Sequence, residues 1–367
     1  MFTKTDRKIR HVHFEVTTSA PLPVGEQVFV VGRQEALGSW SPDGFPLTRV
    51  DENLWTGAVM LPEDEPVEYK ITRGTWDTEE LTAEGRVAAN KMLEPGGDVT
   101  VRVRVEDWRD GVGGSQPRIT GAYRIHEGFH SEHLRHDRRV IVWLPPSYDR
   151  EVHARFPVLY MQDGQQVFDP RTSTHNQDWQ VDESCTTLMA EGKMREIIVV
   201  AVYCTDERDE EYRPGRGADR YARLVVEELK PYIDRVYKTK TDRASTAIAG
   251  SSLGGTVAFH LMWTRPDVFC GCAALSPVFI DGEETYCIDL VQASDAGPDK
   301  KIYLYCGSGD ERERALQGGV KRMAEVLRGK GCVAGEDVVL REDEGGVHNE
   351  SAWAGHTEEW LQFLFPR

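Results

Sequence analysis

A serine between two glycines is the clearest chemical signal in the sequence. Residues 250–254 read Gly-Ser-Ser-Leu-Gly and fit the pattern G-x-S-x-G, with Ser252 at the centre. The pattern stands between an apolar run at 246–249 and a helical run at 256–263, which is the strand-to-helix context that gives it chemical meaning. Glycines are needed there because a Cβ on either side of such a tight turn would collide with backbone. We therefore predict that Ser252 is a nucleophile at the carboxyl edge of a sheet.

An orienting carboxylate is expected further along the chain. A neutral serine needs a base, the base needs an acid to hold it, and the chain order in this setting is Ser, Asp/Glu, His. Asp310 follows the apolar run 301–305 through the short loop 306–309, a position from which a carboxylate can reach across the sheet edge. Asp310 is the predicted acid, and Glu311 beside it is the alternative.

A histidine completes the predicted set. His348 follows the strand-like residues 338–340 through a glycine-containing loop at 345–347 and precedes the last helical segment. Its imidazole would take the proton of the serine hydroxyl, with Asp310 fixing the tautomer. His356 lies in the predicted terminal helix and is the alternative base.

Acyl transfer also needs two backbone N–H donors for the negative charge that develops on the carbonyl oxygen. The residue after the nucleophile, Leu253, supplies the first. The second is expected from the turn that ends the apolar run 158–161, where Gly164 permits close approach and Gln165 presents its N–H. An ordinary Asp-Gly turn without this role is the alternative.

A second motif matches a zinc site literally but is interpreted differently. Residues 126–130 read His-Glu-Gly-Phe-His and fit H-E-x-x-H, a motif that works only on a helix with both histidines on one face. Here Gly128 interrupts a segment that runs between strand-like residues at 122–125 and 139–144. A β-hairpin is predicted instead, and neither a metal nor another cofactor is expected.

The residues that carry this chemistry lie where buried strands alternate with helices. Apolar runs too continuous for half-exposed strands occur at 140–144, 157–161, 197–202, 246–249 and 301–305. Between the third and fourth runs, five apolar residues recur at helical spacing, namely Tyr221, Val225, Leu229, Tyr232 and Val236. The alternation predicts an α/β fold with helices on both faces of a mostly parallel sheet. Together with the G-x-S-x-G turn, this predicts the α/β-hydrolase type.

The first part of the chain has a different pattern. Short β-type runs separated by turn residues occur at 12–16, 27–32, 55–59, 67–71 and 100–105, and their regular spacing predicts a small all-β sandwich. The length of 367 residues also exceeds what one core usually organises. Small and polar residues at 111–117 suit a linker. The predicted division is a sandwich at 1–109, a linker at 110–117 and an α/β domain at 118–367.

The net charge and the cysteines of the chain indicate which partners it can bind and in which cellular compartment it is found. The net charge of -17 repels phosphate backbones and anionic lipids, so neither nucleic acid nor a membrane is an expected partner. No apolar stretch has the pattern of a signal peptide or a membrane span. Seven scattered cysteines suit buried thiols in a reducing compartment. A soluble cytoplasmic protein is predicted.

Three segments resemble a known family of α/β-hydrolases. Residues 159–165 (LYMQDGQ), 249–255 (AGSSLGG) and 345–353 (GGVHNESAW) look like motifs of the putative-esterase, or esterase D-like, group. That group includes enterobactin esterases, feruloyl and acetyl xylan esterases, and antigen 85 mycolyltransferases. The resemblance covers about residues 118–367. It implies the same triad, and a second oxyanion amide at Gln165.

The first part of the chain resembles a starch-binding module of the CBM20 type. The similar segments are 37–40 (LGSW), 54–55 (LW), 61–62 (LP) and 68–70 (EYK). Such modules present two tryptophans and a lysine to a glucose face, and the matching residues are Trp40, Lys70 and Trp76. An acidic stretch through Glu79, Glu80 and Glu84 follows Trp76 and departs from the pattern. In the alternative, Trp40 and Trp55 belong to the sandwich core and the module only shapes a cleft.

These observations predict a serine carboxylic ester hydrolase that acts through an acyl-enzyme intermediate. The sugar-binding resemblance suggests substrates with carbohydrate-linked esters, and α-glucan as a partner of the first domain. Acyl transfer to a second alcohol and cleavage of a siderophore trilactone would use the same triad and are the nearest alternatives. A catalytically silent glycan-binding protein is the alternative from another class.

Overall fold

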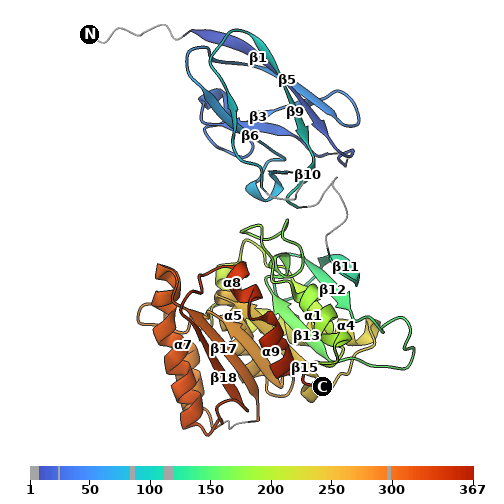
Figure 1. Ribbon diagram of the computed structural model, residues 1–367, viewed down its shortest axis with the longest axis vertical. Coiled ribbons are helices and arrows are strands. Elements are labelled where there is room, and N and C mark those ends of the chain that lie inside the picture. Colours follow the sequence, from blue (N-terminus) through green and yellow to red (C-terminus); the bar gives the residue numbers. More distant parts are fainter. Residues whose placement is uncertain (1–7, 24, 83–86, 111–118, 296–298) are drawn as a thin grey trace. The chain divides into compact units, whose positions relative to one another are not determined.

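The computed structural model describes residues 8–23, 25–82, 87–110, 119–295 and 299–367 (Figure 1). The chain divides into two compact units. Unit 1 consists of Met1–Arg118 and Pro170–Gln177, and unit 2 of Ile119–Asp169 and Asp178–Arg367. The linker expected at 110–117 falls, except for its first residue, outside the described residues, so its bounds stay a prediction.

Unit 1 contains two four-stranded sheets, with the orders β4-β5-β1-β9 and β3-β2-β6-β8, and a short β7-β10 pair. Its strands are β1 (Ile9–Thr18), β2 (Phe29–Gly32), β3 (Phe45–Pro46), β4 (Thr48–Arg49), β5 (Leu54–Pro62), β6 (Val67–Thr72), β7 (Glu80–Leu81), β8 (Lys91–Leu93), β9 (Val99–Val105) and β10 (Asp107–Trp108). Alternate side chains of β1 point inward, so Val12, Phe14 and Val16 are fully buried. They share one core with Val30 and Ile71 of the other sheet, which confirms the predicted all-β domain.

Unit 2 contains an eight-stranded sheet in the order β11-β12-β14-β13-β15-β16-β17-β18. Its strands are β11 (Ala122–Phe129), β12 (Arg138–Leu144), β13 (Val158–Gln162), β14 (Ile198–Val202), β15 (Thr246–Ser251), β16 (Gly271–Leu275), β17 (Lys301–Gly307) and β18 (Val338–Asp343). The pairings β11-β12 and β12-β14 are antiparallel, and all pairings from β14 to β18 are parallel. This mixed, mostly parallel sheet confirms the predicted α/β class.

Helices cover both faces of this sheet (Figure 1). They are α1 (Val181–Ala190), α2 (Arg208–Tyr212), α3 (Ala218–Arg223), α4 (Lys230–Val236), α5 (Leu253–Thr264), α6 (Tyr286–Ala293), α7 (Glu311–Gly329), α8 (Glu350–Ala354) and α9 (Thr357–Leu364). In β12, Val140 and Val142 join the core beneath α5, whereas Ile141 and Trp143 join the core beneath α1 and α9. Strands buried on both faces are apolar throughout. None of the helices described is long and apolar enough to cross a membrane.

The predicted crossover helix is present but irregular. Residues 218–236 are helical through α3, a π-helical segment at Leu224–Leu229, and α4. Tyr221 and Leu229 are fully buried, as the helical spacing predicts, whereas Val236 is 48% exposed. A π turn holds more residues than an α turn, so the residues after it rotate away from the buried face. The last residue of the predicted apolar stripe therefore faces solvent.

The H-E-x-x-H segment lies in a β-hairpin, as predicted. His126 belongs to β11, which pairs antiparallel with β12. Its Nε2 lies 2.6 Å from the hydroxyl of Tyr237, while the exposed His130 has its Nδ1 2.8 Å from Asp137 Oδ1. The two histidines do not share a helical face, so the geometric requirement of the zinc motif is not met.

The turn between β15 and α5 leaves no room for a side chain at Gly250. A Cβ built there would lie 2.5 Å from the carbonyl carbon of Gly254, which is backbone and cannot move aside. We expect Gly250→Ala to lower the free energy of unfolding by about 1–3 kcal/mol, the usual cost of overpacking. Urea unfolding followed by tryptophan fluorescence measures this loss.

Gly318→Ala is the matched control. Gly318 lies within α7, and no heavy atom lies within 4 Å of a Cβ added there. Because alanine favours a helix over glycine by about 0.5–1 kcal/mol, this variant should be more stable than the wild type. Equal stabilities of the two variants would contradict the steric role of Gly250.

Candidate active site

Ser252 occupies a strained turn between β15 and α5. Its backbone has φ 53° and ψ −128°, which few non-glycine residues adopt. The Ser252 N–H donates to the carbonyl of Leu275 at 2.8 Å, which ties the turn to β16. A Cβ on Gly254 would lie 2.6 Å from Asp163 Oδ2, so this flank must also be glycine. Local sterics and packing together produce the geometry of a nucleophile elbow.

His348 lies within hydrogen-bonding distance of the serine. Its Nε2 is 3.1 Å from Ser252 Oγ. The histidine is in the loop between β18 and α8, and its ring packs edge-on against Trp353 with centroids 5.1 Å apart. Trp353 is in turn held by a 3.0 Å hydrogen bond from Nε1 to Ser276 Oγ. This arrangement can move a proton from the serine hydroxyl to the imidazole.

The carboxylate on the other side of the imidazole is that of Glu313. Glu313 Oε1 lies 2.7 Å from His348 Nδ1, and Oε2 accepts from the Gly307 N–H at 2.7 Å. The Glu313 side chain has no exposed surface, and a buried carboxylate is tolerated only when its oxygens have partners. Glu313 therefore holds His348 in the tautomer whose Nε2 can accept a proton.

Asp310, the predicted acid, has a different role in the structure. It is the N-cap of α7, and its Oδ1 accepts from the Glu313 N–H at 2.8 Å. Its Oδ2 accepts from the backbone N–H of His348 at 2.6 Å, not from the ring. These two backbone donors, that of Glu313 first, lower the pKa of Asp310 below its ordinary value. The predicted contact of Asp310 with the imidazole is wrong, because its carboxylate caps α7 and anchors the histidine loop.

A sequence signal for Glu313 existed. An aspartate followed three residues later by a glutamate is the pattern of an N-cap with a glutamate one turn into the helix. Glu311, the alternative acid, is exposed on the same turn. His356, the alternative base, has its Nε2 3.2 Å from Asp343 Oδ2.

The two predicted oxyanion donors belong to turns that follow neighbouring parallel strands. Leu253 is the first residue of α5, where backbone N–H groups have no acceptor inside the helix. Gln165 lies in the short helical turn Gly164–Gln166 after β13, and β13 pairs directly with β15. A Cβ on Gly164 would lie 2.7 Å from the backbone of Ala201, so only glycine fits. The Gln165 side chain adds an anchor by accepting from the Cys204 N–H at 3.3 Å.

Arg208 holds the same turn from α2. Its Nε and Nη2 lie 2.7 Å from Asp163 Oδ1 and Oδ2, a bidentate pair. Asp163 has φ 55°, a conformation that persists only when its surroundings hold it. The guanidinium also lies over the Tyr212 ring, 5.1 Å from its centroid. Arg208 lies in an acidic stretch of the sequence that carries no catalytic motif, so its role depends on the tertiary structure.

The positively charged side chain of Arg312 faces the nucleophile. Arg312 Nη2 lies 3.4 Å from Ser252 Oγ. Arg312 is in the first turn of α7, between the capping Asp310 and the buried Glu313. No sequence pattern singled it out, because the contact depends on how α7 packs against β17 and β18.

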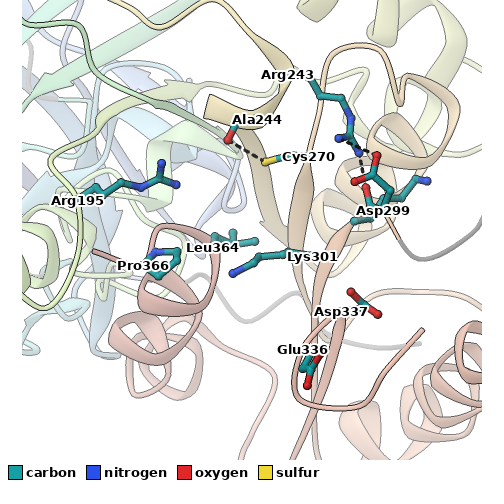
Figure 2. A pocket seen from close by; sticks show the side chains of 11 residues that line it. Arg195, Arg243, Ala244, Cys270, Asp299, Lys301, Glu336, Asp337, Leu364 and Pro366 are labelled. Carbon is teal, nitrogen blue, oxygen red and sulfur yellow. Dashed lines mark hydrogen bonds and ion pairs between the residues drawn. The ribbon is translucent and has the colours of Figure 1, made fainter. Parts of the chain in front are cut away.

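Two cavities of unit 2 lie at opposite ends of the strands of its sheet. A small pocket is lined in part by Leu253, at the edge that carries the nucleophile. A cavity of about 330 Å³ lies where β16 and β17 begin, and Figure 2 shows Arg195, Arg243 and Lys301 around it. Parallel α/β sheets carry their active sites at the carboxyl ends of the strands. The cavity of Figure 2 is therefore separate from the Ser252 site.

Three acidic side chains are close enough to hold a cation. Carboxylate oxygens of Asp178, Asp182 and Glu183 lie within 4.8 Å of one another. Burial raises the pKa of Asp178 to about 7 and that of Asp182 to about 9, with the Glu183 carboxylate adding to both shifts. Carboxyl groups with such pKa values can share a proton instead of binding a metal. The expectation of metal-free chemistry stays a prediction.

The predicted sugar-binding residues come from neighbouring parts of unit 1. The Trp40 N–H donates to the Gly32 carbonyl at 2.8 Å, and Gly32 ends β2, which pairs with the strand β6 that carries Lys70. Trp76 opens the short helical turn Trp76–Thr78 after β6 and is 38% exposed. An indole with this exposure can stack on a sugar ring.

Lys70 is engaged by a carboxylate of the same unit. Its Nζ lies 2.6 Å from Glu79 Oε2, and the side chains are only 13% and 8% exposed. Arg109 Nη1 lies 3.0 Å from the other Glu79 oxygen. The acidic stretch that departs from the starch-binding pattern thus neutralises the lysine of the predicted platform.

Two family models match the chain. The model described as "Starch binding domain" matches residues 10–91. The model described as "Putative esterase" matches residues 131–364, which is more than half of the chain. The chain belongs to the putative esterase family. This membership and the starch-binding match confirm both resemblances predicted from the sequence.

Known proteins align with the esterase region or with most of the chain. The endo-1,4-beta-xylanase/feruloyl esterase of Xylanibacter ruminicola is 28% identical over 232 residues, which are 61% of this chain and 29% of that protein. This chain therefore spans less than a third of that relative. A ferulic acid esterase has a TM-score of 0.55 at 23% identity, covering 66% of this chain and 98% of its own. The ferric enterobactin esterase of Salmonella typhimurium has a TM-score of 0.56 at 16% identity, covering 92% and 88%. These two structures share the fold of this esterase family member.

The contacts of Glu313 and Asp310 make the identity of the acid testable. Glu313→Gln removes the charge that orients His348, so we expect kcat on a nitrophenyl ester to fall by about 100- to 10,000-fold. Asp310→Asn keeps a capping acceptor and should cost less than about tenfold. Circular dichroism verifies that both variants are folded. An equal loss in both variants would contradict the assignment of Glu313.

Because of the cluster of Asp178, Asp182 and Glu183, we expect the free energy of unfolding to depend on pH. An unfolded aspartate titrates near pH 4, whereas folding raises the pKa of Asp182 to about 9. The folded chain thus binds the proton more tightly, and this stabilising contribution, complete below about pH 4, is lost as the pH rises toward 9. Asp182→Asn, which mimics the protonated form, should lose less stability than the wild type between about pH 5 and about pH 8.5 in urea unfolding.

Asp267→Asn is the control for this prediction. The pKa of Asp267 is lowered, mainly by its hydrogen bond with Arg265, so this group gives no loss of stability as the pH rises through that range. Its variant should follow the wild-type pH dependence. If Asp182→Asn also follows the wild-type curve, Asp182 does not hold a proton in the folded chain at neutral pH.

Proposed function

We propose that the chain is a serine carboxylic ester hydrolase whose catalytic residues are Ser252, His348 and Glu313. One observation carries the proposal: Ser252 Oγ lies 3.1 Å from His348 Nε2, and His348 Nδ1 lies 2.7 Å from Glu313 Oε1. The serine occupies an elbow turn and the carboxylate is buried, which is the arrangement that activates a neutral serine. Membership in the esterase family supports the same reaction class.

The first half-reaction acylates the serine. Ser252 Oγ attacks the ester carbonyl carbon while His348 Nε2 takes the hydroxyl proton. The carbonyl oxygen becomes an oxyanion, to which the N–H groups of Leu253 and Gln165 donate. The tetrahedral intermediate collapses by breaking the bond to the alcohol oxygen, which receives the proton from the imidazolium. The alcohol leaves, and the acyl group stays on Ser252 as an ester.

The second half-reaction releases the acid. His348 takes a proton from water, and the water oxygen attacks the acyl carbon. The bond to Ser252 Oγ breaks, and the imidazolium returns its proton to that oxygen. Glu313 stays ionised and stabilises the imidazolium in both half-reactions.

A carbohydrate-linked ester is the proposed substrate. The starch-binding match covers residues 10–91, and the Xylanibacter relative is named a xylanase and feruloyl esterase. Unit 1 would bind an α-glucan through the exposed Trp76, since an indole and an apolar sugar face desolvate each other on stacking. Unit 2 would cleave an ester attached to that carbohydrate.

Cleavage of a siderophore trilactone is the second candidate. The ferric enterobactin esterase aligns with 92% of this chain, and therefore with both units. Acyl transfer would follow from the same acyl-enzyme if a second alcohol replaced water. Product analysis with a feruloylated sugar and with a triserine trilactone, each with added alcohol, separates these reactions.

A cytoplasmic location is proposed from the cysteines. All seven are free, which suits a compartment where thiols stay reduced. Disulfides form and persist in oxidising compartments and are rare in cytosolic proteins. Fractionation of cells that express the chain tests this location.

Hydrolysis of p-nitrophenyl acetate and butyrate tests the proposed reaction. Ser252→Ala removes the nucleophile and His348→Ala removes the base, so we expect kcat to fall at least about 10,000-fold in each. Labelling by a fluorophosphonate should be lost in the serine variant as well. A wild type no faster than its folded Ser252→Ala variant would reject the esterase and favour the silent glycan-binding alternative.

Retention on insoluble starch tests the proposed glucan contact. Trp76→Ala removes the exposed indole, and we expect the affinity to fall at least about fivefold, as loss of one aromatic contact implies. Val50→Ala, at a position 61% exposed in the same unit, is the control and should bind like the wild type. Equal retention of the wild type and Trp76→Ala would exclude Trp76 from a glucan contact.

A further inference from the structure

Arg312 is held beside the nucleophile by the residues on either side of it. Asp310 caps α7 by accepting from the Glu313 N–H at 2.8 Å, and Glu313 is fixed by contacts at 2.7 Å to Gly307 and His348. The first turn of α7 is therefore anchored on both sides of Arg312. From this turn the guanidinium Nη2 reaches to 3.4 Å from Ser252 Oγ.

The charge of Arg312 has no counter-ion within the part of the chain that the structure describes. The Asp310 oxygens accept from the N–H groups of Glu313 and His348. The Glu313 oxygens face Gly307 and the imidazole. By contrast, Arg213, which lines the pocket beside Leu253, pairs with Asp209 and Asp281.

An anion is the chemical group that such a guanidinium binds best. The hydrogen bond to Ser252 Oγ uses one of its five N–H donors, so the remaining donors and the charge are available to a substrate. The chain as a whole carries a net charge of -17 and repels anions. A local cation at Ser252 favours the binding of an anionic substrate, and Arg312 provides one.

We propose that Arg312 is a specificity-determining residue that selects esters with an anionic group, such as a carboxylate, next to the scissile bond. This inference rests on the proposed esterase function and narrows its substrate class. The anionic group would lie on the acyl side or on the alcohol side of the ester. In either case it contacts the guanidinium while the carbonyl carbon lies at Ser252 Oγ.

Two pairs of matched esters test the proposal. On the alcohol side, 4-nitrophenyl acetate is compared with 3-carboxy-4-nitrophenyl acetate. On the acyl side, 4-nitrophenyl benzoate is compared with 4-nitrophenyl 4-carboxybenzoate. In each pair only one ester carries a carboxylate, and the measured quantity is the ratio of kcat/KM for the anionic ester to that for the neutral ester.

The 367-residue chain and four variants are compared with these esters. In Arg312→Gln we expect the ratio to fall up to about fivefold in at least one pair, since one ion pair made by an exposed side chain is lost. Arg312→Glu should lower it further, and Arg312→Lys should keep most of it. Arg322→Gln is the control, because Arg322 lies on the exposed face of α7 and pairs with Glu325 at 3.3 Å. The pair that responds identifies the side that carries the anion.

The outcomes separate this proposal from the proposed function. If Arg312→Gln lowers kcat/KM equally for anionic and neutral esters, Arg312 acts on the reaction and does not select the substrate, and the proposal fails. Unchanged ratios in both pairs also overturn it, while the esterase assignment stands as long as Ser252→Ala is inactive. If the wild type hydrolyses none of the four esters faster than Ser252→Ala does, the proposed function and this inference fail together.

Discussion

The catalytic edge of unit 2 depends on the contact between two backbone turns. The elbow at Ser252 packs so closely against the turn after β13 that a Cβ on Gly254 would lie 2.6 Å from Asp163 Oδ2. Asp163 is held in its left-handed conformation by the bidentate pair with Arg208. One contact therefore positions the nucleophile and the turn that carries Gln165, the proposed oxyanion donor. A shift of either turn would misplace both groups relative to the reacting carbonyl.

The start of α7 places three charged groups beside the nucleophile and the histidine loop, each with its own task. Asp310 caps the helix and holds the backbone of the histidine loop, Glu313 holds the imidazole, and Arg312 reaches Ser252. Helix geometry allows this division, because successive residues of a helix project in different directions, so that Arg312 and Glu313 reach different groups. A buried Glu313 without the imidazole and the Gly307 N–H would be an uncompensated charge. The same contacts thus stabilise the fold and prepare the reaction.

In unit 1, an acidic residue engages the lysine of the starch-binding pattern. The sandwich core and the exposed Trp76 fit a starch-binding module, but Lys70 is paired with Glu79 in a nearly buried contact. A lysine in such a pair has fewer donors for a hydroxyl group, so the indole carries more of any sugar affinity. The proposed glucan contact is therefore expected to be more apolar than the resemblance alone implies.

Residue order alone predicts Ser252 and His348 as the nucleophile and the base, and it predicts the fold class of both units. These features follow from local rules: glycine sterics define the elbow, and the spacing of apolar residues separates half-buried strands from fully buried ones. The contact of Glu313 with the imidazole was missed, because only Asp310 and Glu311 were weighed as the acid from the sequence, and the carboxylate that reaches the ring depends on how α7 packs against the histidine loop. The contact of Arg312 with Ser252 could not be predicted for the same reason, since it joins segments that lie 60 residues apart in the chain. Local sterics can be deduced from residue order, whereas contacts between docked elements depend on the packing of the whole unit.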